Sequence, residues 1–156
     1  MNFMYSISMK HNCCDTNISE DTAKQLLVEN GLSRTKIKTK VLIILSKSEK
    51  PLSAKDLYKK LGRLKCNIST IFRTLSQFKE KGLVTELNLG EDFFRYELNN
   101  IDGGDHHHHH VRCRGCGDIK YLDYCDLSVF EKMISRLGYK DMEHSLEFTG
   151  VCSECS

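Results

Sequence analysis

The sequence predicts an α+β fold with a mainly helical N-terminal part and a small α/β C-terminal part. Three observations support this prediction. Apolar residues recur at helical spacing over residues 20–80, between residues that cap and end helices. Two β-prone runs then flank a Gly-Glu-Asp turn. Finally, two Cys-x-x-Cys pairs bracket a short pattern of strand, helix and strand near the C-terminus.

The N-terminal part is predicted to hold four helices. Their boundaries follow from Ser, Thr, Asp or Asn at the first position, which can accept hydrogen bonds from free backbone amides, and from Gly or Pro after the last turn. The predicted helices are 20–30, 36–47, 54–61 and 68–81, which are capped in turn by Ser19 or Asp21, by Thr35, by Ser53, and by Asn67 or Ser69.

A β-hairpin is predicted directly after the last of these helices. Residues 83–89 and 93–98 are rich in β-prone side chains, and Gly90 begins the turn between them. Helices followed by such a hairpin are typical of a winged helix-turn-helix, and the short basic link 62–65 suits the turn before a recognition helix. We therefore predict a winged-helix domain over 19–98, preceded by a disordered segment, 1–18.

A second domain is predicted beyond a polar, Gly-rich hinge at 99–105. Within 106–156, residues 119–122 and 142–148 are expected to be strands and 128–137 a helix that ends at Gly138. This α/β dimerisation domain is too small to be stable alone, so we expect it to need a metal and a second copy of the chain.

Composition excludes several classes of protein. The longest apolar run, Val41–Leu45, is far too short to span a membrane, and the N-terminus lacks the pattern of a signal peptide, so a cytoplasmic protein is expected. Residues 31–84 carry 14 basic and 3 acidic side chains, whereas 85–156 carry 7 basic and 14 acidic ones. The first segment suits a polyanion such as DNA and the second suits cations, although solvated helix faces alone could give the same asymmetry.

The most specific motif is the pair of Cys-x-x-Cys knuckles, Cys113 with Cys116 and Cys152 with Cys155. Without a secretion signal, such spacing indicates metal binding rather than disulfides. Four thiolates can surround one Zn²⁺ tetrahedrally and leave no open position, which is the arrangement of a structural site. The alternative is four unrelated free cysteines.

Five consecutive histidines, His106 to His110, run directly into the first knuckle. On a strand, alternate residues face opposite sides, so His108 and His110 would face one way and His107 and His109 the other. One run could then serve two metal sites. The alternative is a disordered polyhistidine loop without a specific role. Further candidate ligands are Glu97, Asp102, Asp105, Asp123, Cys125 and His144.

The predicted helix 68–81 carries candidate DNA-binding residues. Ser69, Thr70 and Arg73 would lie on one face with Phe72 nearby. Arginine can read guanine or grip phosphate, and an aromatic ring can pack against thymine methyl groups. The basic residues expected to neutralise flanking phosphates are Lys59, Lys60, Arg63 and Lys65.

Taken together, these motifs resemble the ferric uptake regulator family over about residue 20 to the end. The matching pieces, in order, are Gly31-Leu32, Thr35, 52–58, 68–75, 82–84, Tyr96-Glu97, the His run into Cys113 to Gly117, Gly138-Tyr139, His144-Ser-Leu, and Gly150-x-Cys152-x-x-Cys155.

The resemblance implies a homodimeric repressor in which a regulatory metal closes the hinge and sets two recognition helices on a palindromic operator. By position, Glu97, His108 and His110 match the hinge sensor ligands of the family. His107, His109 and His144 match a second metal site inside the dimerisation domain.

Several positions depart from the family pattern, and all but Phe72, which lies on the predicted recognition helix, bear on the metal. Lys50-Pro51 stands where iron and peroxide sensors usually have a His, Tyr121 replaces a common acid, His109 replaces an Asp, Ser128 falls near an expected acid, and Phe72 replaces Tyr. Asp102 and Asp105 could supply replacement ligands. Because oxygen ligands are lost, the set favours Zn²⁺ over Fe²⁺ as regulatory metal, with iron sensing as the alternative.

Proteins of two other classes share some of these motifs. A zinc deaminase needs a His-x-Glu motif and an open zinc position, and the sequence has neither, so no enzymatic activity and no small organic substrate are expected. A histidine-rich metal store or chaperone would not explain the basic segment 31–84 or the winged-helix pattern.

Overall fold

The computed structural model describes residues 17–62, 64, 66–99, 109–122, 126–142, 144 and 146–156. These residues form two compact units. The N-terminal unit holds the described residues up to 85 together with 96–99, and the C-terminal unit holds Glu86–Arg95 with the described residues from 109 onward. The predicted hinge 99–105 lies outside the described residues apart from Asn99.

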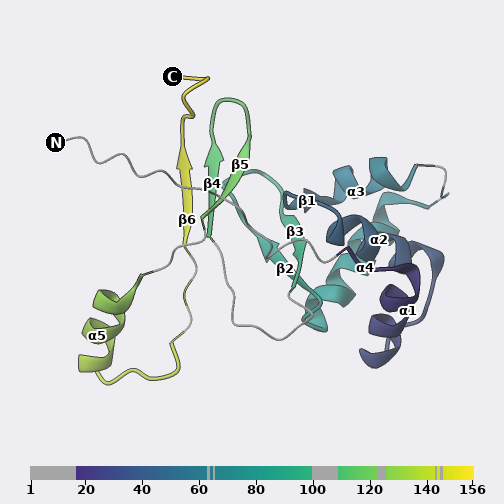
Figure 1. The fold of residues 1–156 in the computed structure, drawn as a ribbon, viewed down its shortest axis with the longest axis horizontal. Coiled ribbons are helices and arrows are strands. Elements are labelled where there is room, and N and C mark those ends of the chain that lie inside the picture. The colour runs from purple at the N-terminus through teal and green to yellow at the C-terminus, as the bar shows by residue number, and fades with distance from the viewer. Residues whose placement is uncertain are drawn as a thin grey trace. The chain divides into compact units, whose positions relative to one another are not determined.

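The described part of the N-terminal unit contains four helices at the predicted places: α1 (Glu20–Glu29), α2 (Lys36–Ser46), α3 (Ala54–Leu61) and α4 (Ile68–Glu80), as Figure 1 shows. Ser19, Thr35 and Ser53 each accept a hydrogen bond from a backbone amide in the first turn, which confirms the predicted caps. Ser53 also forms a reciprocal pair with Asp56, whose carboxylate accepts the backbone N–H of Ser53. Asn67 precedes α4 without a side-chain cap.

A small sheet follows in the order β1-β3-β2 (Figure 1), and its residues Glu86, Leu87 and Arg95 count with the C-terminal unit. It consists of β1 (Leu52–Ser53), β2 (Val84–Leu87) and β3 (Arg95–Leu98), of which β1 was not predicted. The predicted hairpin strands were too long, because residues 88–94 fold into a tip of their own. Gly90 takes the left-handed φ of 70°, and its N–H donates to Asn88 Oδ1 at 3.2 Å.

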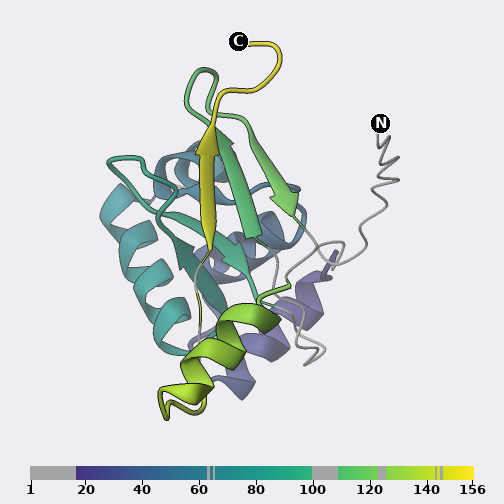
Figure 2. The same ribbon diagram turned by 90° about the vertical axis from the view of Figure 1, so that its left-hand side faces the viewer.

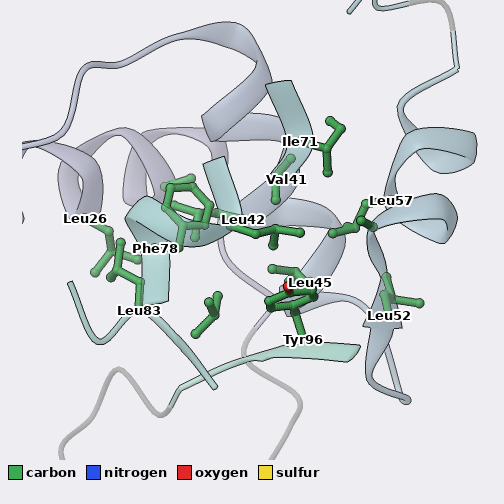
Figure 3. Close-up of a cluster of buried hydrophobic side chains, with 14 of the residues drawn as sticks. Leu26, Val41, Leu42, Leu45, Leu52, Leu57, Ile71, Phe78, Leu83 and Tyr96 are labelled. Carbon is green, nitrogen blue, oxygen red and sulfur yellow. The ribbon is translucent and has the colours of Figure 1, made fainter. Parts of the chain in front are cut away.

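The core of the N-terminal unit gathers apolar side chains from all four helices and from β1, β2 and β3 (Figure 3). Leu42, Leu57 and Phe78 are fully buried in it. Ile18 is buried too, and its backbone N–H donates to Ser46 Oγ at 3.4 Å. The prediction that disorder extends to residue 18 is therefore wrong at that residue, because the core takes up its side chain; residues 1–16 lie outside the described residues.

The C-terminal unit has a second sheet in the order β5-β4-β6, with β4 (His109–Cys113), β5 (Ile119–Leu122) and β6 (Glu147–Gly150) visible side by side in Figure 2. β4 pairs antiparallel with β5 and parallel with β6. The helix α5 (Ser128–Arg136) was predicted almost to the residue.

The prediction of a strand from 142 was wrong, because β6 begins only at Glu147. Among the described residues, its first partner is His110 of β4. The predicted α+β fold class is otherwise confirmed. Among the described residues, every helix is too short or too polar to cross a lipid bilayer.

Candidate metal centre and nucleic-acid interface

The two cysteine knuckles lie at one end of the second sheet. Cys113 ends β4, and the parallel register pairs it with Gly150 at the end of β6, two residues before Cys152. All four sulfurs lie within 4.8 Å of one another, and Cys116 Sγ is 3.8 Å from Cys152 Sγ. A tetrahedral zinc site with Zn–S bonds of about 2.3 Å has sulfur–sulfur edges of about 3.8 Å. The four cysteines therefore fit a structural zinc site.

The backbone around the cluster is shaped to hold thiolates. Cys113 Sγ accepts hydrogen bonds from the backbone N–H groups of Gly115 and Cys152, each at 3.3 Å. A Cβ at Gly115 would lie 2.9 Å from Cys155 Cβ and 3.0 Å from its sulfur, which is closer than real Cβ atoms approach. Glycine at this position thus lets the second knuckle close on the first.

Backbone hydrogen bonds and crowding of the sulfurs separate the acidities of the cysteines. N–H donors, first from Cys116 and then from Cys152, lower the pKa of Cys113 to about 6. The neighbouring thiol groups of Cys152 and Cys116 raise the pKa of Cys155 to about 12. The Cys113 thiol therefore ionises more readily than an ordinary cysteine, whereas the thiols of Cys116 and Cys155, whose pKa values are raised, need a cation to stabilise their ionised form.

Two histidines of β4 are described, and they face opposite sides of the sheet. The ring of His110 lies beside Tyr121, with centroids 5.0 Å apart, whereas the ring of His109 lies beside His144, with centroids 5.3 Å apart. His109 Nδ1 is also 3.1 Å from the carbonyl oxygen of Leu146. His109 and His110 are both buried. The contact between His109 and His144 brings together two residues that the sequence assigned to one site.

Of the remaining predicted metal ligands, only Glu97 lies among the described residues. Glu97 lies on β3 in the N-terminal unit and is half-buried. The predicted grouping of Glu97 with His108 and His110 stays a prediction. The other candidates lie outside the described residues; they are His107, His108, Asp102, Asp105, Asp123 and Cys125.

The predicted DNA-reading side chains are largely on the outer face of α4. Burial of Ile71, Thr74, Leu75 and Phe78 fixes the inner face of this helix. Ser69, Phe72 and Arg73 are exposed, Phe72 by 52%, and Thr70 is half-buried. Lys59 and Lys60 are exposed on α3, whereas Arg63 and Lys65 lie outside the described residues. Ser76 and Gln77 are exposed as well and continue this outer face by one turn, as helical spacing predicts.

A winged-helix unit with an exposed outer face on α4, joined to a unit with a four-cysteine centre, defines a metal-binding transcription regulator. The chain belongs to the ferric uptake regulator family, whose sequence model matches residues 29–149. The chain is 36% identical over 143 residues to the ferric uptake regulation protein of Staphylococcus epidermidis, which covers 88% of this chain and 96% of that protein.

Two further relatives extend this similarity. The peroxide operon regulator of Bacillus subtilis is 34% identical over 137 residues, or 86% of this chain and 91% of that protein. The crystal structure of the Vibrio cholerae ferric uptake regulator superposes with a TM-score of 0.71 at 30% identity, over 83% of this chain and 98% of that one. The family consists of transcription regulators, and the chain is a regulator of this kind rather than an enzyme.

Proposed function

We propose that the chain is a zinc-responsive transcription repressor that binds a palindromic DNA operator as a homodimer. In this proposal Zn²⁺ at the four cysteines joins the C-terminal tail to the start of the sheet. A second, regulatory ion binds the histidines of the His run and Glu97, and it switches DNA binding by binding the DNA-competent conformation more tightly than the other.

The observation that most favours zinc is the side chain beside His110. Tyr121 lies directly opposite His110 in the β4–β5 ladder, with ring centroids 5.0 Å apart. Many members of the family carry an acid at this position, and a neutral phenol offers no carboxylate to a metal held by the His run. His109 similarly brings a nitrogen ligand next to His144. Nitrogen-rich sites suit Zn²⁺ better than Mn²⁺, while Fe²⁺ also accepts imidazole, so iron sensing is the second candidate.

The experiment that separates the two metals is a DNA-binding titration in metal buffers. A protein that carries only its structural zinc is titrated separately with free Zn²⁺, Fe²⁺ and Mn²⁺ in the presence of fluorescent palindromic DNA. Activation of DNA binding by buffered trace Zn²⁺ alone supports zinc sensing. Activation by Fe²⁺ or Mn²⁺ with no response to added Zn²⁺ would instead establish an iron-type regulator.

The dimer is supported by an unpartnered apolar face on α5. The described residues of this helix include no buried side chain, and its apolar residues recur at helical spacing: Val129, Phe130, Met133, Ile134 and Leu137 are all exposed. A contiguous patch of this kind marks an interface. A second copy of the chain is its occupant in this proposal, because a palindromic operator needs two recognition helices related by two-fold symmetry.

Phe130→Glu is expected to shift the protein from dimer to monomer at micromolar concentration, because it places a charge on the apolar face of α5. Light scattering coupled to size-exclusion chromatography measures the mass. Lys132→Glu, on the same helix but outside the apolar stripe, is the control and should remain dimeric. A dimeric Phe130→Glu protein would place the interface elsewhere.

Since an operator-binding repressor must reach the chromosome, the proposal also places the chain in the cytoplasm.

A further inference from the structure

The tip of the β2–β3 hairpin, residues 88–94, belongs to the C-terminal unit, and one side chain of β4 holds it there. Arg112 Nε donates a hydrogen bond to the carbonyl oxygen of Leu89 at 2.5 Å, and Arg112 Nη2 donates another to that of Gly90 at 3.1 Å. One guanidinium thus binds two successive carbonyl groups of the tip. The planar, forked shape of arginine makes such a double contact possible.

The contact is close, and its half at Leu89 is partly shielded from water. Leu89 is only 1% exposed, so its carbonyl needs a protein partner to offset desolvation. Gly90 lies over two strands of the sheet: a Cβ there would be 3.7 Å from Arg112 Nη2 and 3.8 Å from the methyl group of Thr149 on β6. Arg112 and Thr149 are direct partners in the β4–β6 ladder. The tip therefore rests on one defined face of the sheet.

Contacts within the tip also hold its residues in a fixed arrangement. The carboxylate of Glu91 accepts hydrogen bonds from Nε and Nη2 of Arg95, at 2.5 and 2.9 Å, and both side chains are mostly buried. The guanidinium of Arg95 lies 5.3 Å from the centroid of the Phe93 ring. A bidentate ion pair that is shielded from solvent holds a single geometry.

We propose that Arg112 is a latch that fixes the wing tip to the metal-carrying sheet, so that the tip moves with the C-terminal unit. The chain passes from one unit to the other within β2 and β3, at residues 85–86 and 95–96. Arg112 is a positioning residue in this account. It directly precedes the cluster residue Cys113 and lies on the same face of β4 as His110, so the strand that carries the metal ligands also holds the wing.

The latch is tested by hydrogen exchange of the zinc-loaded full-length dimer, without DNA or regulatory metal. Arg112→Met keeps the apolar stem and removes every donor, and exchange of the peptide covering 86–95 should become faster by about tenfold or more. Exchange in α4 should stay unchanged. Arg114→Met is the matched control, since it removes the same charge two residues along and should exchange like the wild type. Unchanged exchange of 86–95 in Arg112→Met protein of full zinc content would overturn the proposal.

A measurement on the wild-type chain keeps the test decisive if Arg112→Met protein fails to fold. Arginine Nε–H groups exchange quickly unless they are hydrogen-bonded and shielded. The Arg112 Nε–H resonance, assigned by its disappearance in Arg112→Lys protein, should persist in nitrogen-15 spectra at neutral pH. A rapidly exchanging Arg112 Nε–H would overturn the latch. Neither readout depends on which regulatory metal acts, so failure of the latch and failure of zinc sensing are distinguishable.

Discussion

Replacing Cys152 with serine is expected to abolish zinc binding and to unfold the C-terminal unit. The described residues of this unit offer little core to stabilise it alone, since its sheet strands span only four or five residues and α5 buries no side chain. Structural zinc sites contribute apparent free energies on the order of 10–16 kcal/mol at neutral pH, which is folding free energy when no preformed site exists in the unfolded chain. A single lost thiolate removes much of that contribution.

The measurement combines metal analysis with thermal unfolding. Wild-type protein should carry one tightly held Zn²⁺ per chain and lose cooperative unfolding of the C-terminal unit after treatment with a strong chelator. Cys152→Ser protein should resemble the chelated wild type from the start. Cys66→Ser is the control, because Cys66 lies beside the core of the N-terminal unit and outside the cluster. A Cys152→Ser protein with full zinc content and an unchanged unfolding profile would refute the structural site.

Arg73→Ala is expected to weaken operator binding by roughly 5- to 150-fold, the equivalent of about 1–3 kcal/mol for one good base or charged contact. Arg73 is exposed on the outer face of α4, one turn after Ser69, so its loss should leave the fold intact. Fluorescence anisotropy with metal-loaded protein measures the affinity, and thermal unfolding checks stability.

The control for this change is Arg136→Ala, which removes an exposed arginine from the last turn of α5. Its affinity should equal that of the wild type at the same salt concentration. If Arg73→Ala protein binds the operator as tightly as the wild type does, α4 is not the DNA-reading helix. Affinities are compared over a range of salt, because lost phosphate contacts also lower the slope of the salt dependence.

The elements with local signals were predictable from the sequence. The caps at Ser19, Thr35 and Ser53 and the apolar stripe of α4 depend on residues three or four positions apart, and the helices confirm them. The cysteine cluster was equally predictable, because Cys-x-x-Cys spacing lets both sulfurs of a pair bind one metal ion. The lengths of the strands were predicted less well: β6 begins at Glu147 rather than at residue 142, because strand ends depend on pairing with residues far away in the sequence.

Contacts between residues far apart along the chain could not be predicted from the sequence. Arg112 could be read as one more surface charge, because its partners are carbonyl groups of Leu89 and Gly90, and every residue has a carbonyl group. Ile18 likewise follows a polar segment in the sequence, and its burial depends on contacts with the core. The contact of His109 with His144 was suggested only by family resemblance, because 35 residues separate the two along the chain.

The most direct test of the account is the operator affinity of the dimer with structural zinc alone, compared with that after the regulatory metal is added. Wild-type protein should bind the palindrome tightly only in the second state. His110→Ala should keep its structural zinc and need a higher free metal concentration for the same affinity, because an imidazole ligand is lost. Equal affinity in both states, for wild type and variant alike, would contradict metal control of DNA binding.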